Sequence, residues 1–205
     1  MRYPEFRDHF KVFPLFSTSD IYKTQPNFDK RRLVEWQKKN YLLKLGNGYY
    51  TFKEYTRDEQ FLYLVSNKIY QPSYVSLESA LAYYGFIPEG VFTVTAISTL
   101  KTKIFETAIG RFSYRKLKDD LFFGYTLQPV GDTHFKIAFP EKALLDYLYL
   151  NRAVSHPEDF EHLRFNKSII LQSITMKKLK LYCRQSGFSR LDQQVDSLLK
   201  YLRHA

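Results

Sequence analysis

The chain has 205 residues, of which 44% are hydrophobic, 18% aromatic and 25% charged. This balance is typical of a globular protein with a packed core and excludes an intrinsically disordered chain. A single cysteine, Cys183, excludes a disulfide within the chain and a zinc site built on cysteines. No apolar run approaches the ~18 residues that a membrane-spanning helix needs, and Glu5 and Asp8 interrupt the segment where a secretory signal would lie. We therefore expect a cytoplasmic protein with no membrane partner.

The net charge of +10 is unevenly distributed along the chain. It amounts to +5 over residues 1–55, −2 over residues 56–163 and +7 over residues 164–205. Basic surfaces attract polyanions, so the two ends favour DNA, RNA or an anionic membrane surface as a partner. A basic composition that serves solubility alone is the other interpretation.

The first 55 residues predict three helices followed by a tight hairpin. Phenylalanines at i, i+4 and i+7 predict a helix over residues 5–13. Ser17 or Ser19 can cap a short second helix. A third helix is predicted over Asp29–Asn40, and Gly46–Gly48 joins two strand-like segments as a hairpin. This order is that of a winged helix-turn-helix.

The third helix is predicted to have a packed face and a cationic face. With 100° per residue, Trp36 and Gln37 lie near the inward direction set by Leu33, and most of the basic residues lie opposite or on the flanks. Such a helix fits the major groove, where Arg31 is the best candidate for a guanine contact and the lysines position the duplex through phosphates. The predicted DNA-binding residues are Lys30, Arg31, Arg32, Lys38, Lys39, Lys44 and Asn47, the last two on the wing. A solvated helix face and a protein-docking module are the alternatives.

Residues 56–205 are predicted to form a C-terminal domain with an antiparallel sheet and helices. Helices are expected over residues 57–69 and 76–85, the second with Ser76 as N-cap and Gly85 as a left-handed C-terminal residue. Alternating patterns predict strands at 91–97, 103–109, 111–117, 121–126 and 133–139. Their close spacing favours antiparallel pairing. Pro140 then begins a largely buried helix, so the fold class is α+β.

Three segments carry a resemblance to a known family. They are Ser73–Gly85 (SYVSLESALAYYG), the Phe105-Glu106-Thr107 stretch with the glycine and aromatics up to Tyr114, and Ala138–Asp146 (AFPEKALLD). Together with the basic helix and wing, they resemble the AbiEi-type antitoxins, transcriptional regulators of type IV abortive-infection toxin–antitoxin systems. The resemblance implies a winged-helix domain that binds promoter DNA and represses its own operon. It also implies a C-terminal antitoxin domain that counteracts a nucleotidyltransferase-like toxin without a stable complex.

The last forty residues predict two basic amphipathic helices, Thr175–Ser186 and Ser189–Arg203, separated by Gly187. Four residues of the first are candidates for secondary nucleic-acid contacts, namely Lys177, Lys178, Lys180 and Arg184. A solvated helix pair is the alternative. The apolar sides of these helices can also support an oligomer on paired half-sites.

The sequence offers no constellation of catalytic residues. Its 8 glycines form no phosphate-binding loop. His156 and His162 are six residues apart, a spacing that does not place them on one face of a helix, so a metal pair is not expected. Cys183 lies in an apolar stripe, which is typical of an inert core thiol. We therefore expect no metal, no cofactor and no enzymatic activity. The predicted function is a DNA-binding autorepressor and antitoxin, and the alternative is a stand-alone winged-helix regulator or a protein- or RNA-binding module without a toxin.

Overall fold

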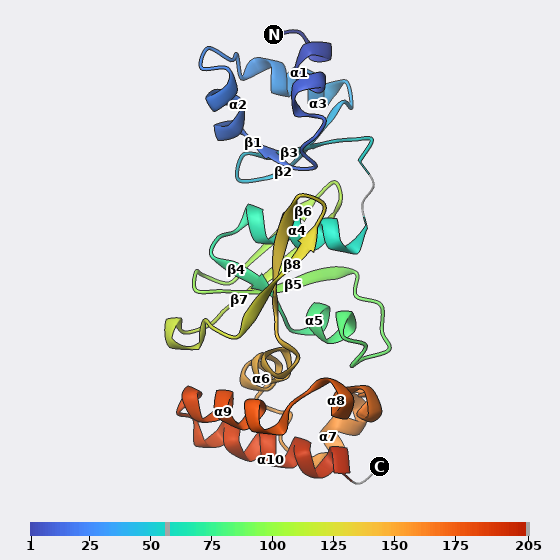
Figure 1. Ribbon diagram of the computed structural model, residues 1–205, viewed down its shortest axis with the longest axis vertical. Coiled ribbons are helices and arrows are strands. Elements are labelled where there is room, and N and C mark those ends of the chain that lie inside the picture. Colours follow the sequence, from blue (N-terminus) through green and yellow to red (C-terminus); the bar gives the residue numbers. More distant parts are fainter. Residues whose placement is uncertain (56–57, 204–205) are drawn as a thin grey trace.

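A computed structural model describes residues 1–55 and 58–203. It places an N-terminal module, a central sheet with its helices and a C-terminal helical layer along the longest axis of the molecule (Figure 1). The fold is thus α+β. Residue 56, where the second domain is predicted to begin, and residue 57, the first of the helix predicted over 57–69, lie outside the described residues. In the described part, no helix has both the length and the apolar character needed to cross a bilayer.

The N-terminal module follows the predicted order of helices and hairpin. Its elements are α1 (Tyr3–Phe10), β1 (Phe16–Ser17), α2 (Thr18–Thr24), α3 (Arg31–Lys38), β2 (Leu42–Gly46) and β3 (Tyr49–Phe52). The strands form a small antiparallel sheet in the order β1-β3-β2. The two-residue strand β1 is too short for a periodicity to reveal it in the sequence.

An aromatic cluster holds this module together. The ring of Phe6 from α1 lies 4.7 Å from those of both Phe10 and Trp36, 5.5 Å from that of Phe16 and 6.1 Å from that of Phe52. Each of these side chains is buried. Aromatic rings bury large apolar areas, so a few of them stabilise a module of about 50 residues that lacks disulfides.

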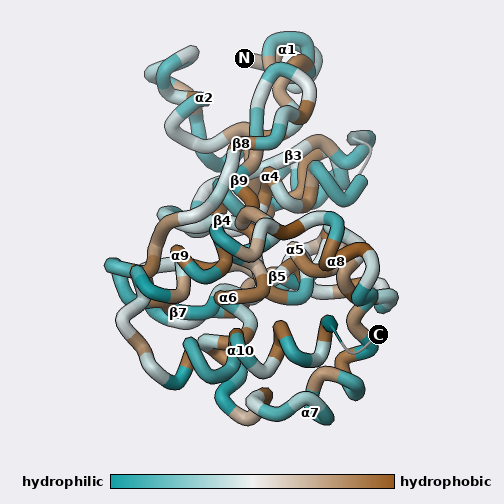
Figure 2. The backbone as a smooth tube through the Cα atoms, turned by 60° about the horizontal axis from the view of Figure 1, so that its bottom comes forward, coloured by the Kyte–Doolittle hydropathy of each residue, from teal (hydrophilic) through white to brown (hydrophobic). Residues whose placement is uncertain are grey.

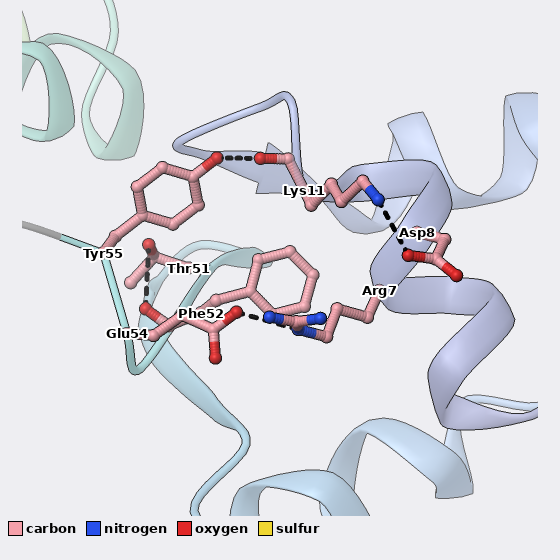
Figure 3. Close-up of polar contacts among 7 residues, drawn as sticks. All are labelled: Arg7, Asp8, Lys11, Thr51, Phe52, Glu54 and Tyr55. Carbon is pink, nitrogen blue, oxygen red and sulfur yellow. Dashed lines mark hydrogen bonds and ion pairs between the residues drawn. The ribbon is translucent and has the colours of Figure 1, made fainter.

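Polar contacts fix the ends of the N-terminal elements. Ser17 caps α2 by accepting a hydrogen bond from the backbone N–H of Asp20 at 3.2 Å, as one of the two predicted caps. The segment after β3 is fastened to α1, because Arg7 Nε donates to Glu54 Oε1 at 2.8 Å (Figure 3). The hydroxyl of Tyr55 also donates to the backbone oxygen of Lys11 (Figure 3).

The central layer is a six-stranded sheet in the order β6-β7-β5-β4-β9-β8. Its elements, with the helices that precede or interrupt them, are α4 (Glu59–Ile69), β4 (Ser73–Val75), α5 (Glu78–Tyr83), β5 (Thr93–Ser98), β6 (Lys103–Thr107), β7 (Gly110–Lys116), the 3₁₀ turn η1 (Asp119–Leu121), β8 (Tyr125–Val130) and β9 (Thr133–Ala138).

The sheet is mixed, so the prediction of an antiparallel sheet is wrong for two of its pairs. β5 pairs with β7 in parallel, and β4 pairs with β9 in parallel. After β5 the chain skips one position in the sheet to form the edge strand β6, and β7 then returns into the gap antiparallel to β6. The short spacing between strands correctly predicts the hairpins β6–β7 and β8–β9. It does not specify which strand from earlier in the chain each hairpin pairs with.

Two local predictions in this layer are also wrong. The strand expected over 121–126 is replaced by η1 and a strand that begins only at Tyr125. Ser76 is not a helix cap, because α5 begins at Glu78 after Leu77 at a φ of +58°. The Ser76 hydroxyl instead donates to the buried carboxylate of Asp146 at 2.8 Å. Gly85 has the left-handed conformation expected after the helix, with a φ of +70°.

A buried ion pair ties the helix α6 (Pro140–Leu150) to the sheet. The ammonium of Lys142 donates to the carboxylate of Asp146 one turn later, and both side chains are almost completely buried. The Tyr74 hydroxyl on β4 donates to the same carboxylate at 2.9 Å and accepts from Lys142 at 3.0 Å. The charges are thus compensated and hydrogen-bonded, as buried charges must be.

The C-terminal layer consists of α7 (Pro157–His162), α8 (Lys167–Ser173), α9 (Met176–Ser186) and α10 (Ser189–Arg203). The last two helices agree with the prediction to within one residue at each end. Gly187 ends α9 at a φ of +68°. Hydrophobic and hydrophilic positions alternate along α10, as expected for a helix packed on one side (Figure 2).

Asp146→Asn keeps the shape of the carboxylate but leaves the Lys142 ammonium without a counter-charge. We expect it to lower the free energy of unfolding by about 3–5 kcal/mol, measured by urea denaturation. Asp8→Ala is the control, because Asp8 forms an exposed pair with Lys11 and should not move the denaturation midpoint. Adding Lys142→Met to Asp146→Asn should recover part of the loss, and a double variant no more stable than the single one would contradict this role.

Candidate nucleic-acid interface

The helix α3 presents the packed and solvent faces that its sequence predicts. Leu33 and Trp36 are buried in the N-terminal core, and Gln37 lies half-buried beside them. The Gln37 side-chain amide donates to the backbone oxygen of Leu33 at 2.8 Å. Gln37 is therefore engaged within the helix, at the boundary of the core.

The predicted cationic side chains are all on the surface. Exposed residues of this group are Lys30, Arg31, Arg32, Lys38 and Lys39 on or next to α3, and Lys44 on β2. Lys30 Nζ lies 5.4 Å from the centroid of the Tyr22 ring on α2, a cation–π distance. The core thus directs the basic side chains of α3 toward solvent.

Two acidic residues partly neutralise this face. Arg31 Nη2 lies 2.9 Å from Asp29 Oδ2, and the Arg31 backbone N–H donates to Asp29 Oδ1 at 3.0 Å. The hydrogen bond from the Arg31 side chain lowers the pKa of Asp29. Lys39 Nζ lies 2.7 Å from Glu35 Oε1, and this hydrogen bond lowers the pKa of Glu35. Both carboxylates are thus held ionised beside their cations.

The remaining cations give the face its net positive charge. Among the described residues, no ion pair involves Lys30, Arg32, Lys38 or Lys44. Exposed ion pairs are weak and exchange readily with solvent. A polyanion can therefore recruit Arg31 and Lys39 as well, in competition with their carboxylate partners.

The tip of the β2–β3 hairpin faces the rest of the molecule. Asn47, at a φ of +46°, is exposed, but its side-chain Nδ2 donates to the backbone oxygen of Ile69 at 2.6 Å. Ile69 is the last residue of α4, where carbonyl groups lack partners within the helix. The neighbouring Gly46 packs near the ring of Phe105 on β6. The amide predicted to contact DNA thus caps a helix of the central layer.

The tail cations are not brought together with α3. The helix α9 lies in the C-terminal layer, and α3 lies in the N-terminal module at the other end of the long axis (Figure 1). Lys177, Lys180 and Arg184 are exposed on α9. Lys178 instead turns inward, with Nζ 3.1 Å from the buried carboxylate of Glu141 and 3.7 Å from the centroid of the Phe139 ring. Three of the four predicted tail residues therefore form a surface separate from α3.

Two ionisable side chains, the Cys183 thiol and the Glu141 carboxylate on α6, are buried. Cys183 is buried on α9, and this burial is the main cause that raises the pKa of its thiol to about 12, so the thiolate is scarce at neutral pH. Glu141 is buried and accepts a hydrogen bond from the backbone N–H of Thr175 at 2.9 Å, which caps α9. Within residues 1–55 and 58–203, no three acidic, histidine or cysteine side chains are arranged to hold a metal ion.

A cleft of about 620 Å³ lies between α5, β5, β7 and α6. Apolar side chains such as Leu81 and Phe165 form much of its lining, and Glu78 and Arg115 contribute opposite charges. The sequence contains no signal for this cleft, because its walls come from segments that are far apart in the chain.

In comparisons with known proteins, no protein-family model and no curated protein matches this chain. The function is therefore inferred from the surfaces described above.

We expect Asn47→Gly to lower the free energy of unfolding by about 1 kcal/mol, because the Ile69 carbonyl loses its hydrogen bond while glycine retains the positive φ. Asn40→Gly is the matched control, since Asn40 is an exposed asparagine at a φ of +58°. Urea denaturation compares the two. Equal effects of the two substitutions would show that the Asn47–Ile69 contact contributes nothing.

Proposed function

We propose that this chain binds double-stranded DNA through the outer face of α3. The observation that carries the proposal is the division of this helix into a buried face, with Leu33 and Trp36, and an exposed face rich in lysine and arginine. An α-helix fits the major groove of B-form DNA, where cationic side chains reach phosphates and base edges.

The order of elements supports the same function. The succession α1-β1-α2-α3-β2-β3, with the small sheet ordered β1-β3-β2, is that expected of a winged helix-turn-helix. In helix-turn-helix proteins the second helix of the pair is the one that enters the groove. That helix is α3 here.

The proposed contacts differ from the sequence prediction in the hairpin. Lys30, Arg32, Lys38 and Lys44 are assigned to phosphates, because they are exposed and form no ion pair within the described residues. Asn47 is left out of the contact set because its amide caps α4. The tip of the hairpin then serves to hold the N-terminal module on the central layer, and Lys44, in the middle of β2, is the hairpin residue assigned to the duplex.

Replacing Arg31 and Lys38 together by alanine is expected to weaken duplex binding about tenfold or more. Each phosphate contact that is lost should also reduce the slope of log affinity against log salt by about 0.9. A gel-shift series at several salt concentrations measures both. The double variant Lys200→Ala/Arg203→Ala removes the same charge from the exposed side of α10 and should leave affinity nearly unchanged. If both double variants lost the same affinity, the effect would come from net charge alone, and α3 would not be the helix that contacts DNA.

The resemblance to AbiEi-type antitoxins extends the proposal to an autorepressor that also neutralises a nucleotidyltransferase-like toxin. The segments Ser73–Gly85 and Ala138–Asp146, which carry the resemblance, meet in the structure through the contacts of Tyr74 and Ser76 with Asp146. This polar cluster gives both segments a shared structural role in the central layer.

Co-expression tests the antitoxin role. A nucleotidyltransferase-like gene next to the gene for this chain should arrest growth when induced alone, and co-expression of the full chain should restore growth. The variant Arg31→Ala/Lys38→Ala should still restore growth from a heterologous promoter, because it alters only the DNA-binding face. Growth arrest that this chain does not relieve would favour a stand-alone regulator, and binding to RNA but not to duplex DNA would favour an RNA-binding module.

A further inference from the structure

Val34 is an apolar residue on the otherwise polar outer face of α3. It is 54% exposed. In the part of the chain that the structure describes, it belongs to neither cluster of packed apolar side chains. The β-branched side chain restricts rotamers in a helix and lowers helix propensity slightly relative to alanine. The folded chain alone therefore gains little from a valine at this position.

The position of Val34 is central to the proposed contact face. Arg31 lies three residues before it and Lys38 four residues after it, so the three side chains form one row along the helix. Both neighbours are exposed cations. A duplex held by these cations would thus meet the valine methyl groups between them.

Two other side chains of α3 that can distinguish base pairs, Gln37 and Arg31, are already engaged. The Gln37 amide donates to the Leu33 carbonyl. The Arg31 guanidinium makes three contacts to the Asp29 carboxylate, with its Nε 3.1 Å from both Oδ1 and Oδ2 and its Nη2 2.9 Å from Oδ2. A guanine contact by Arg31 therefore has to displace a carboxylate first. Val34 has no such partner to displace.

We propose that Val34 reads thymine in the major groove by packing its methyl groups against the C5 methyl of that base. This inference rests on the proposed DNA-binding function and names the base that α3 selects. Thymine is the one base of unmodified DNA that presents a methyl group in the major groove, and apolar side chains recognise it there. The contact requires no hydrogen bond and no rearrangement of the ion pairs around it.

The test compares thymine with uracil, which differs only in lacking that methyl group. Duplexes bound by the full chain are first selected from a random-sequence pool, and each thymine of the preferred duplex is then replaced singly by deoxyuridine. Loss of one well-packed methyl contact should weaken binding of the unmodified protein about fourfold at one position. In Val34→Ala, which lacks both γ-methyl groups of valine, most of the preference for the thymine duplex over the uracil duplex should be lost in a gel-shift titration.

Val12→Ala is the matched control, because Val12 is a 69% exposed valine outside α3. This variant should retain the full preference for thymine over uracil. Circular dichroism checks that Val34→Ala is folded, as alanine at an exposed helix position should be. Tight duplex binding that is insensitive to every uracil substitution would overturn the inference and leave the DNA-binding proposal standing. A preference that persists in Val34→Ala would assign the methyl contact to another residue, and absence of duplex binding would overturn both proposals together.

Discussion

The packing of Trp36 and Leu33 into the N-terminal aromatic core is the constraint on which the candidate interface depends. The Trp36 ring lies 4.7 Å from that of Phe6 and 5.8 Å from that of Phe28, so α3 is held by rings from two other segments. A helix that is held on one side has a fixed rotation about its axis. Because successive residues are rotated by 100° about the helix axis, the basic side chains of α3 must then point to solvent, away from Leu33 and Trp36. Burial, and not repulsion among the charges, thus determines where the basic face lies.

Two acidic residues on or next to α3 neutralise part of the charge of that face. Asp29 and Glu35 lie within one turn of the cations they pair with, Arg31 and Lys39. These pairs reduce the net charge of the face, and because they are exposed they contribute little to the stability of the fold. The remaining cations give this face its net positive charge, and positively charged surfaces attract polyanions.

The hairpin joins the N-terminal module to the central layer. Asn47 satisfies the end of α4, and Gly46 allows the close approach of the Phe105 ring. Beyond the sheet, the buried pair of Lys142 and Asp146 fixes α6, and α6 in turn supports the C-terminal helices. At both places a polar group forms hydrogen bonds that link elements of the fold: the Ile69 carbonyl with the hairpin, and the Lys142–Asp146 pair with the sheet.

Local patterns in the sequence were sufficient to predict most of the helices, the hairpin and the outward direction of the α3 cations. These features depend on residues within one or two turns of each other: the spacing of Leu33 and Trp36, the cap at Ser17, and the glycines at 85 and 187. Only the tertiary structure decided the parallel pairs of the sheet, the role of Ser76 as a partner of Asp146, and the contacts that Asn47 and Lys178 make with other parts of the chain. The reason is physical. Each of these features depends on a partner that is far away in the chain. The sequence around a polar residue does not show which distant atom will form its hydrogen bond once the layers have packed.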